Sequence, residues 1–139
     1  MDDVATTTAL CVILGRIPGW VWNPDDTDYP ADKVGIFYGA IGTDPDRAVG
    51  VRIYGGTDDP ETGLATRRAQ VRFRGGRRDP AGADDLAGLA FARLQGLSRV
   101  GGINGIRRES WSPFGADTNG REERTDNYII TIDNPEVLQ

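Results

Sequence analysis

Residues 66–74 show the clearest alternation of apolar and polar side chains in this 139-residue sequence. Ala69, Val71 and Phe73 fall on one side of an extended chain. The other side carries long polar side chains (Arg68, Gln70, Arg72 and Arg74). A repeat of two residues is typical of a β-strand with one face in a core and the other in solvent. This segment therefore predicts a strand in a sheet that has one open, arginine-rich face.

Other segments are also expected to be extended. Residues 34–41 are almost all apolar or small, as in a strand that is buried on both faces. Valine and isoleucine alternate with other residues over 49–54, and residues 105–111 and 121–133 resemble further strands. A short extended piece is expected over 17–22. These patterns predict a largely antiparallel sheet of about four or five strands.

Two helices are expected to complete the domain. Asp2 can cap a helix that runs to about Gly15. Asp79 followed by Pro80 is typical of the start of a second helix, and Gly96 of its end. Its apolar stripe falls at helical spacing (Leu86, Leu89, Ala90, Leu94 and Leu97, interrupted by Arg93). The sequence thus predicts one α+β domain over residues 1–139, with the helices packed on one face of the sheet.

Two acidic segments lie between the expected elements. Residues 23–32 are rich in Asp and Pro, and residues 55–63 contain Asp58, Asp59 and Glu61. Both lack enough apolar side chains to order themselves, so we expect them to be mobile in the free subunit and to meet a partner. The spacing of the first segment is not that of an EF-hand, and a solvated acidic loop is favoured over a Ca²⁺ site.

Composition argues against several classes of function. The sequence has no His, one Cys and a formal net charge of −5. It therefore lacks His-based catalysis and thiolate metal sites, and we expect no catalytic residue, no metal and no cofactor. The net charge also disfavours a dedicated nucleic-acid binder. The longest early apolar run, residues 9–14, is too short to span a membrane, so we expect the protein to stay in the cytoplasm or to join an assembly there.

The arginine face has three possible roles. It can be a solvated surface whose charges pair with carboxylates elsewhere in the sheet. It can be an interface in which Arg68, Arg72 and Arg74 bind carboxylates of a neighbouring subunit. It can also contact DNA phosphates. If it is an exposed interface, replacing Arg72 and Arg74 by Glu should leave the fold intact.

Several short motifs together resemble a known family. They are Pro45-Asp46-Arg47 before a strand, Arg72-Phe73-Arg74-Gly75-Gly76, Asp84-Asp85-Leu86 in a helix, and Asn119-Gly120-Arg121 before the last strand, which contains Tyr128. Their order is similar to that of the minor capsid, or tail-terminator, proteins of long-tailed bacteriophages.

This resemblance implies a structural virion protein at the head–tail joint. Such subunits form a ring, commonly a hexamer, that caps the tail-tube protein and meets the head connector. DNA would pass through the ring without sequence-specific binding, and no membrane would be involved. The interface candidates are then Arg68, Arg72 and Arg74 on the strand, with Asp58, Asp59 and Glu61 in the second acidic loop. The alternatives are another connector or head-completion protein or, further off, a small ligand-binding or enzymatic domain.

Overall fold

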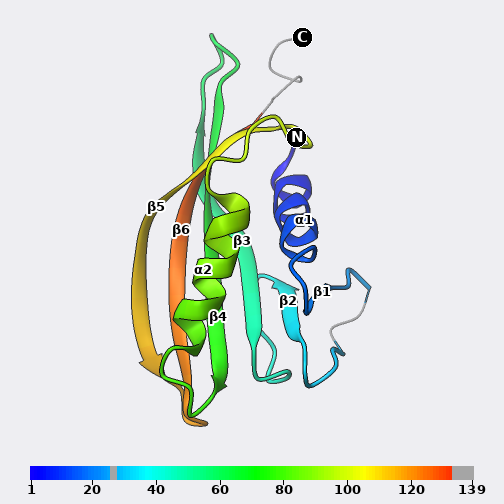
Figure 1. The fold of residues 1–139 in the computed structure, drawn as a ribbon. Coiled ribbons are helices and arrows are strands. Elements are labelled where there is room, and N and C mark those ends of the chain that lie inside the picture. The colour runs from blue at the N-terminus through cyan, green and yellow to red at the C-terminus, as the bar shows by residue number, and fades with distance from the viewer. Residues whose placement is uncertain (26–27, 133–139) are drawn as a thin grey trace.

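A mixed β-sheet forms the centre of the molecule (Figure 1). The structure is a computed structural model that describes residues 1–25 and 28–132. The described residues form two helices and six strands: α1 (Asp3–Leu14), β1 (Trp20–Trp22), β2 (Val34–Tyr38), β3 (Ala48–Asp58), β4 (Ala65–Arg77), α2 (Gly82–Leu94), β5 (Ile103–Ala116) and β6 (Arg121–Ile132). The predicted α+β class is confirmed. Asp133, the expected end of the last strand, lies outside the described residues.

The strand order is β1-β2-β3-β4-β6-β5. Strands β1, β2 and β3 are parallel to one another, while β3, β4, β6 and β5 are paired antiparallel. The prediction of four or five mostly antiparallel strands is therefore wrong in number and partly wrong in direction. The sequence could not show this, because β1 has only three residues and no local pattern indicates that β2 and β3 run parallel to each other.

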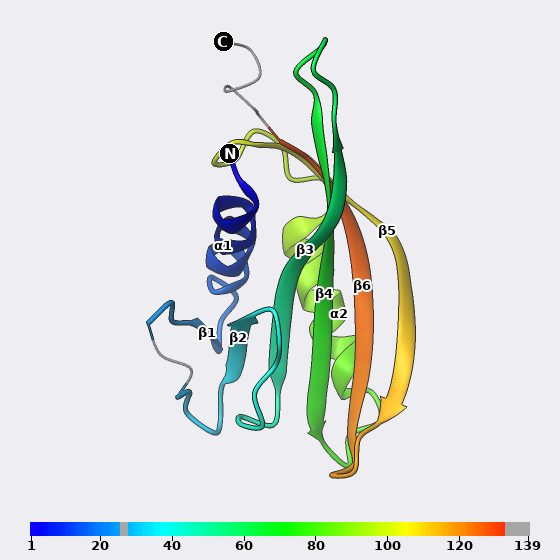
Figure 2. The same cartoon turned by 180° about the vertical axis from the view of Figure 1, so that it is seen from behind.

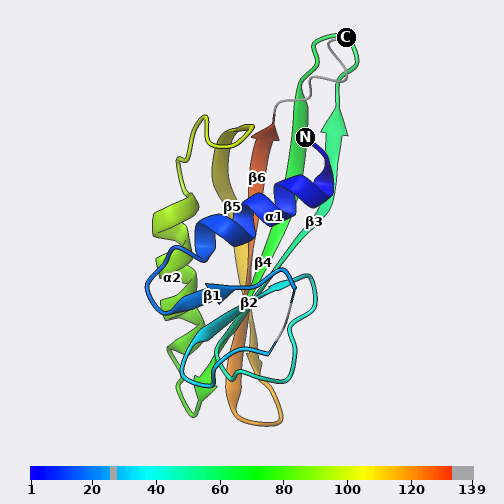
Figure 3. The same ribbon diagram turned by 90° about the vertical axis from the view of Figure 1, so that its right-hand side faces the viewer.

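Both helices pack on the same face of the sheet, as predicted (Figure 3). Asp2 caps α1 by accepting a hydrogen bond from the amide of Ala5 at 2.7 Å. The alternation in β4 is also confirmed, because Ala69, Val71 and Phe73 are completely buried under the helices. Within the described residues no helix is long and apolar enough to cross a membrane.

The β3–β4 hairpin is longer than expected. Residues 55–58, predicted to be loop, continue β3 and pair with β4 as far as Asp58 opposite Ala65. Cross-strand hydrogen bonds satisfy the backbone of this polar, glycine-containing segment whatever its side chains are. The remaining turn is short, and the amide of Asp59 donates to the carbonyl of Leu64. The hairpin projects past the start of α1 at the top of Figure 1.

Two predicted element boundaries are also wrong. Strand β4 does not end at residue 74, where the predicted alternation stops, but continues through Gly75 and Gly76 to Arg77 with a shift in register. Gly75 instead lets α2 approach, because a Cβ there would lie 2.7 Å from the amide nitrogen of Ala83. The second helix begins at Gly82 after Ala81 rather than at Asp79, whose carbonyl accepts a hydrogen bond from the amide of Gly82. The start signal at Asp79 thus marks the turn before α2.

The opposite face of the sheet is open over β3, β4 and β6, as seen from behind in Figure 2. Its β2 end is covered by a small cluster of Tyr29, Phe37 and Ala48, and the segment that follows β2 lies over part of β3. The Tyr29 hydroxyl donates to the carbonyl of Ile36, and the ring packs edge-on against Phe37. Tyr29 therefore anchors the described part of the first acidic loop to the sheet. The mobility of this loop stays a prediction.

Candidate functional site

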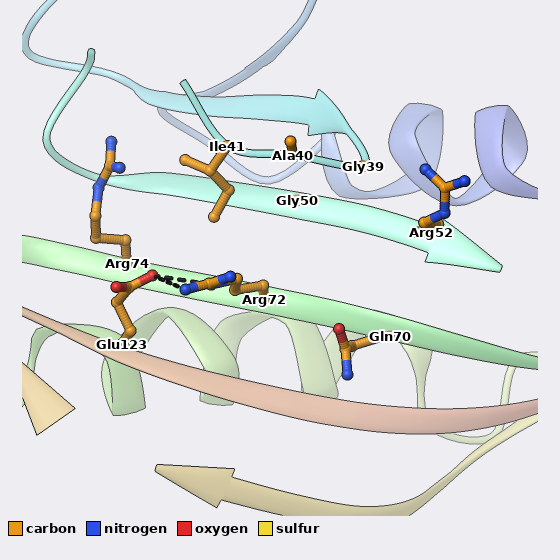
Figure 4. A pocket seen from close by; sticks show the side chains of 9 residues that line it. All are labelled: Gly39, Ala40, Ile41, Gly50, Arg52, Gln70, Arg72, Arg74 and Glu123. Carbon is orange, nitrogen blue, oxygen red and sulfur yellow. Dashed lines mark hydrogen bonds and ion pairs between the residues drawn. The ribbon is translucent and has the colours of Figure 1, made fainter. Parts of the chain in front are cut away.

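A groove crosses the open face of the sheet (Figure 4). It has a volume of about 510 Å³ and lies between the segment that follows β2 and the surface of β3, β4 and β6. Its walls include Ala40 and Ile41 of that segment and polar side chains of the strands (Arg52, Gln70, Arg72, Arg74 and Glu123). We call it the arginine groove.

The groove exists because the segment after β2 lies directly on β3. A Cβ at position 50 would lie 2.3 Å from the carbonyl oxygen of Gly39, so only glycine permits this approach. The alternation of β3 buries Val49 and Val51 under the helices and turns Arg52 to the open face. One wall of the groove is thus a backbone segment, and the floor carries charge.

Arg74 holds the next part of the same segment in place. Its guanidinium donates to four backbone carbonyls, those of Gly42, Thr43, Pro45 and Asp46, at 2.7–3.2 Å. The residue is only 6% exposed. Burial lowers its pKa from the usual range, and the neighbouring Arg121 lowers it further.

This burial changes the prediction made for Arg74. An exposed interface residue could be replaced by Glu at little cost, but a Glu at this site would put a carboxylate against carbonyl oxygens. Arg74 is therefore not the exposed residue that the sequence suggested, and we now expect the double replacement of Arg72 and Arg74 to destabilise the fold. The sequence did not reveal this, because Arg74 continues the same alternation as Arg68 and Arg72.

Arg72 and Arg68 stay on the surface and pair within the subunit. Arg72 binds Glu123 of β6 at 2.8 Å, and its guanidinium carbon lies 5.5 Å from the centre of the Phe114 ring. Arg68 lies further along β4, outside the groove, and pairs with Glu109 of β5. Exposed pairs of this kind contribute little to stability, about 0–1 kcal/mol each. Contact of either arginine with another subunit stays a prediction.

Arg52 is a groove residue that was not among the sequence candidates. Among the described residues it has no hydrogen-bond or ion-pair partner. Its side chain is exposed and lies at the end of the groove away from Arg74 (Figure 4). The alternation of residues 49–54 contained the signal, because that pattern already placed Arg52 opposite the apolar side chains.

The three acidic candidates lie together at the tip of the β3–β4 hairpin. Asp58 binds Arg67 at 2.8 Å. The carboxylate of Asp59 accepts hydrogen bonds from the backbone amides of Glu61 and Thr62, and these hydrogen bonds lower the pKa of Asp59 from the usual range. The side chain of Glu61 is exposed and has no partner among the described residues. We call Asp58, Asp59 and Glu61 the acidic tip.

The structure does not bring the acidic tip and the arginine groove together within one subunit. Asp58 lies six positions after Arg52 on the same strand, which corresponds to ~20 Å. Each feature therefore faces solvent separately. Chemically, the groove presents guanidinium groups that can bind carboxylates or phosphates in pairs of hydrogen bonds. The tip presents carboxylates that can bind a cationic surface.

A second polar cluster, also missed in the sequence, lies on the helix side of the sheet. The completely buried Asp126 binds Arg124 at 2.7 Å and Arg108 at 3.3 Å. The Arg108 guanidinium is sandwiched between the rings of Phe91 and Trp111, with its carbon 4.2 and 4.4 Å from their centres. No local pattern links these positions, because they lie on α2, β5 and β6. Their full pairing indicates a structural role.

Over residues 1–25 and 28–132 no group of three or more acidic, Cys or His side chains is arranged to hold a metal ion. No curated protein matches the chain in sequence. A family model described as bacteriophage tail terminator protein matches residues 20–134, which include every strand and α2 but not α1. The chain therefore belongs to the bacteriophage tail terminator family, whose members are structural components of the phage tail.

Proposed function

We propose that this protein forms a ring that caps the end of the tail tube and joins it to the head connector. The family match over residues 20–134 is the observation that carries the proposal. The chemistry of the surface supports it, because the described charged features are suited to binding charged partners rather than to catalysis. In the virion, the protein would sit at the head–tail joint.

The ring would be built by repeated contacts between unlike surfaces. A head-to-tail contact closes into a ring when the rotation between neighbouring subunits divides a full turn evenly. We propose six copies. Their combined formal charge would be roughly −30, so ring closure should depend on salt concentration, and the lumen would let DNA slide without sticking.

A deletion of the gene in the phage tests the capping role. Without a cap we expect tails of uncontrolled length, measured by electron microscopy, and wild-type protein supplied in trans should restore a single length. A head-completion protein, the second candidate, would give a different result. Its loss should leave tails of normal length that are detached from heads, and this outcome would contradict the proposal.

The oligomeric state of the purified protein provides a second test. We expect a monomer or a weak, salt-dependent oligomer that becomes a ring on tail tubes, because like-charged subunits repel one another. Native mass spectrometry across salt concentrations, with and without tubes, measures this. A tight dimer that neither salt nor tubes affect would contradict the ring.

A further inference from the structure

We propose that the acidic tip of one subunit docks into the arginine groove of the neighbouring copy. This inference rests on the proposed ring and identifies the contact that would close it. The two partners are surfaces of one chain, so each subunit offers one tip and one groove. Such a contact is head-to-tail, and its repetition generates a ring.

The charges of the two surfaces are complementary. Three guanidinium groups and one carboxylate line the groove, so its charge is net positive. The tip carries three carboxylates, of which Asp58 is paired with Arg67, so its charge is net negative. Complementary potentials of this kind steer association and fix the register of a contact.

Each surface also has an unpaired charge. In the described part of the chain Arg52 has no ionic partner in the groove, and Glu61 has none at the tip. Glu61 lies at the outermost turn of the hairpin, where it can enter a groove on another molecule. We therefore expect Glu61 and Arg52 to form the central pair. Arg72 would help to orient the incoming carboxylate while it stays bound to Glu123.

The shape of the subunit directs the tip to another molecule. The hairpin projects beyond the start of α1 (Figure 1), and the strand that leads to the tip also forms the floor of the groove. Gly39, on the groove wall, lies against Gly50, and Asp58 lies eight positions after Gly50 on β3, which corresponds to ~26 Å. Because β3 is a continuous strand, the tip cannot fold back into its own groove.

A disulfide between engineered cysteines tests the contact directly. Glu61→Cys and Ala40→Cys place thiols on the exposed tip and on the exposed wall of the groove. A disulfide needs Cα atoms within about 7 Å, so the pair cannot close inside one subunit. The natural Cys11 is completely buried and should not react. Tails assembled with the double variant should give, after mild oxidation, a ladder of dimers, trimers and larger species on a non-reducing gel.

Three controls define the result. Each single variant should give at most dimers. Glu61→Cys combined with Leu89→Cys, an exposed position on α2 on the other side of the sheet, should give no ladder. A missing ladder in double-variant tails that have normal length would overturn the docking while leaving the proposed function intact. Wild-type protein that never forms a ring on tubes would instead contradict the proposed function.

A charge swap tests the central pair. Glu61→Lys and Arg52→Glu, introduced separately, should each reduce ring yield on tail tubes at least tenfold. The two changes together in one chain should restore it to within twofold of wild type, because the ion pair is re-formed with reversed sign. Arg93→Glu, an exposed change on α2, is the matched control and should have little effect.

Single variants without effect, or a double variant that is not restored, would overturn the pairing. Retained rings with lost binding to duplex DNA in Arg52→Glu would assign the groove to phosphates instead.

Discussion

Arg74 should be the most important arginine for stability, although the sequence does not distinguish it from its neighbours. In Arg74→Ala the carbonyls of Gly42, Pro45 and Asp46 lose the guanidinium, whereas Thr43 keeps a hydrogen bond from Arg121 at 2.8 Å. A net loss of about 1 kcal/mol for each of the three hydrogen bonds predicts a destabilisation of about 3 kcal/mol.

Urea unfolding followed by circular dichroism measures this loss. For a chain of this length 3 kcal/mol corresponds to a lower melting temperature by roughly 10 °C. Arg74→Lys keeps the charge but has no planar fork, so we expect about half the effect. Arg72→Ala is the matched control, because it removes a half-exposed arginine two residues away on the same face and should cost no more than about 1 kcal/mol. An equal loss in Arg74→Ala and Arg72→Ala would refute the reasoning.

Three further predictions concern stability and reactivity. Asp126→Ala leaves two guanidinium groups without their buried partner and should cost about 3 kcal/mol in urea unfolding, whereas Asp84→Ala, on the exposed end of the same network, should cost under 1 kcal/mol. Hydrogen bonds from Arg121 lower the pKa of Asp117. The ionised carboxylate therefore stabilises the folded state fully above about pH 4, and this stabilisation is lost as the pH falls through the lowered pKa. The stability gap between wild type and Asp117→Asn should therefore narrow from pH 7 to pH 3, and a constant gap would contradict this. Burial raises the pKa of Cys11 to about 12, so at pH 8 a thiol reagent should label it only after unfolding.

Local patterns in the sequence were enough for most of the fold. The alternation in residues 66–74 predicted the buried and exposed faces of β4, and the cap at Asp2 predicted the start of α1. Both signals act over a few residues, where strand geometry and backbone hydrogen bonds follow directly from side-chain order. The predictions failed at boundaries, in residues 55–58 and at Gly75, where pairing with a distant strand or contact with a helix decides the conformation.

In the candidate site, too, local patterns predicted some features and distant contacts decided the others. The sequence alone identified an arginine-rich strand face and an acidic segment, because charge and period two are properties of consecutive residues. Only the tertiary structure distinguished Arg74, which is buried against four carbonyls, from Arg72, which stays in solvent. It also added Arg52 to the groove and placed Glu61 in the turn at the end of the β3–β4 hairpin. Burial and pairing depend on segments far apart in the chain, such as the loop that lies over Gly50, and nothing in the local order of residues specifies where such a segment returns.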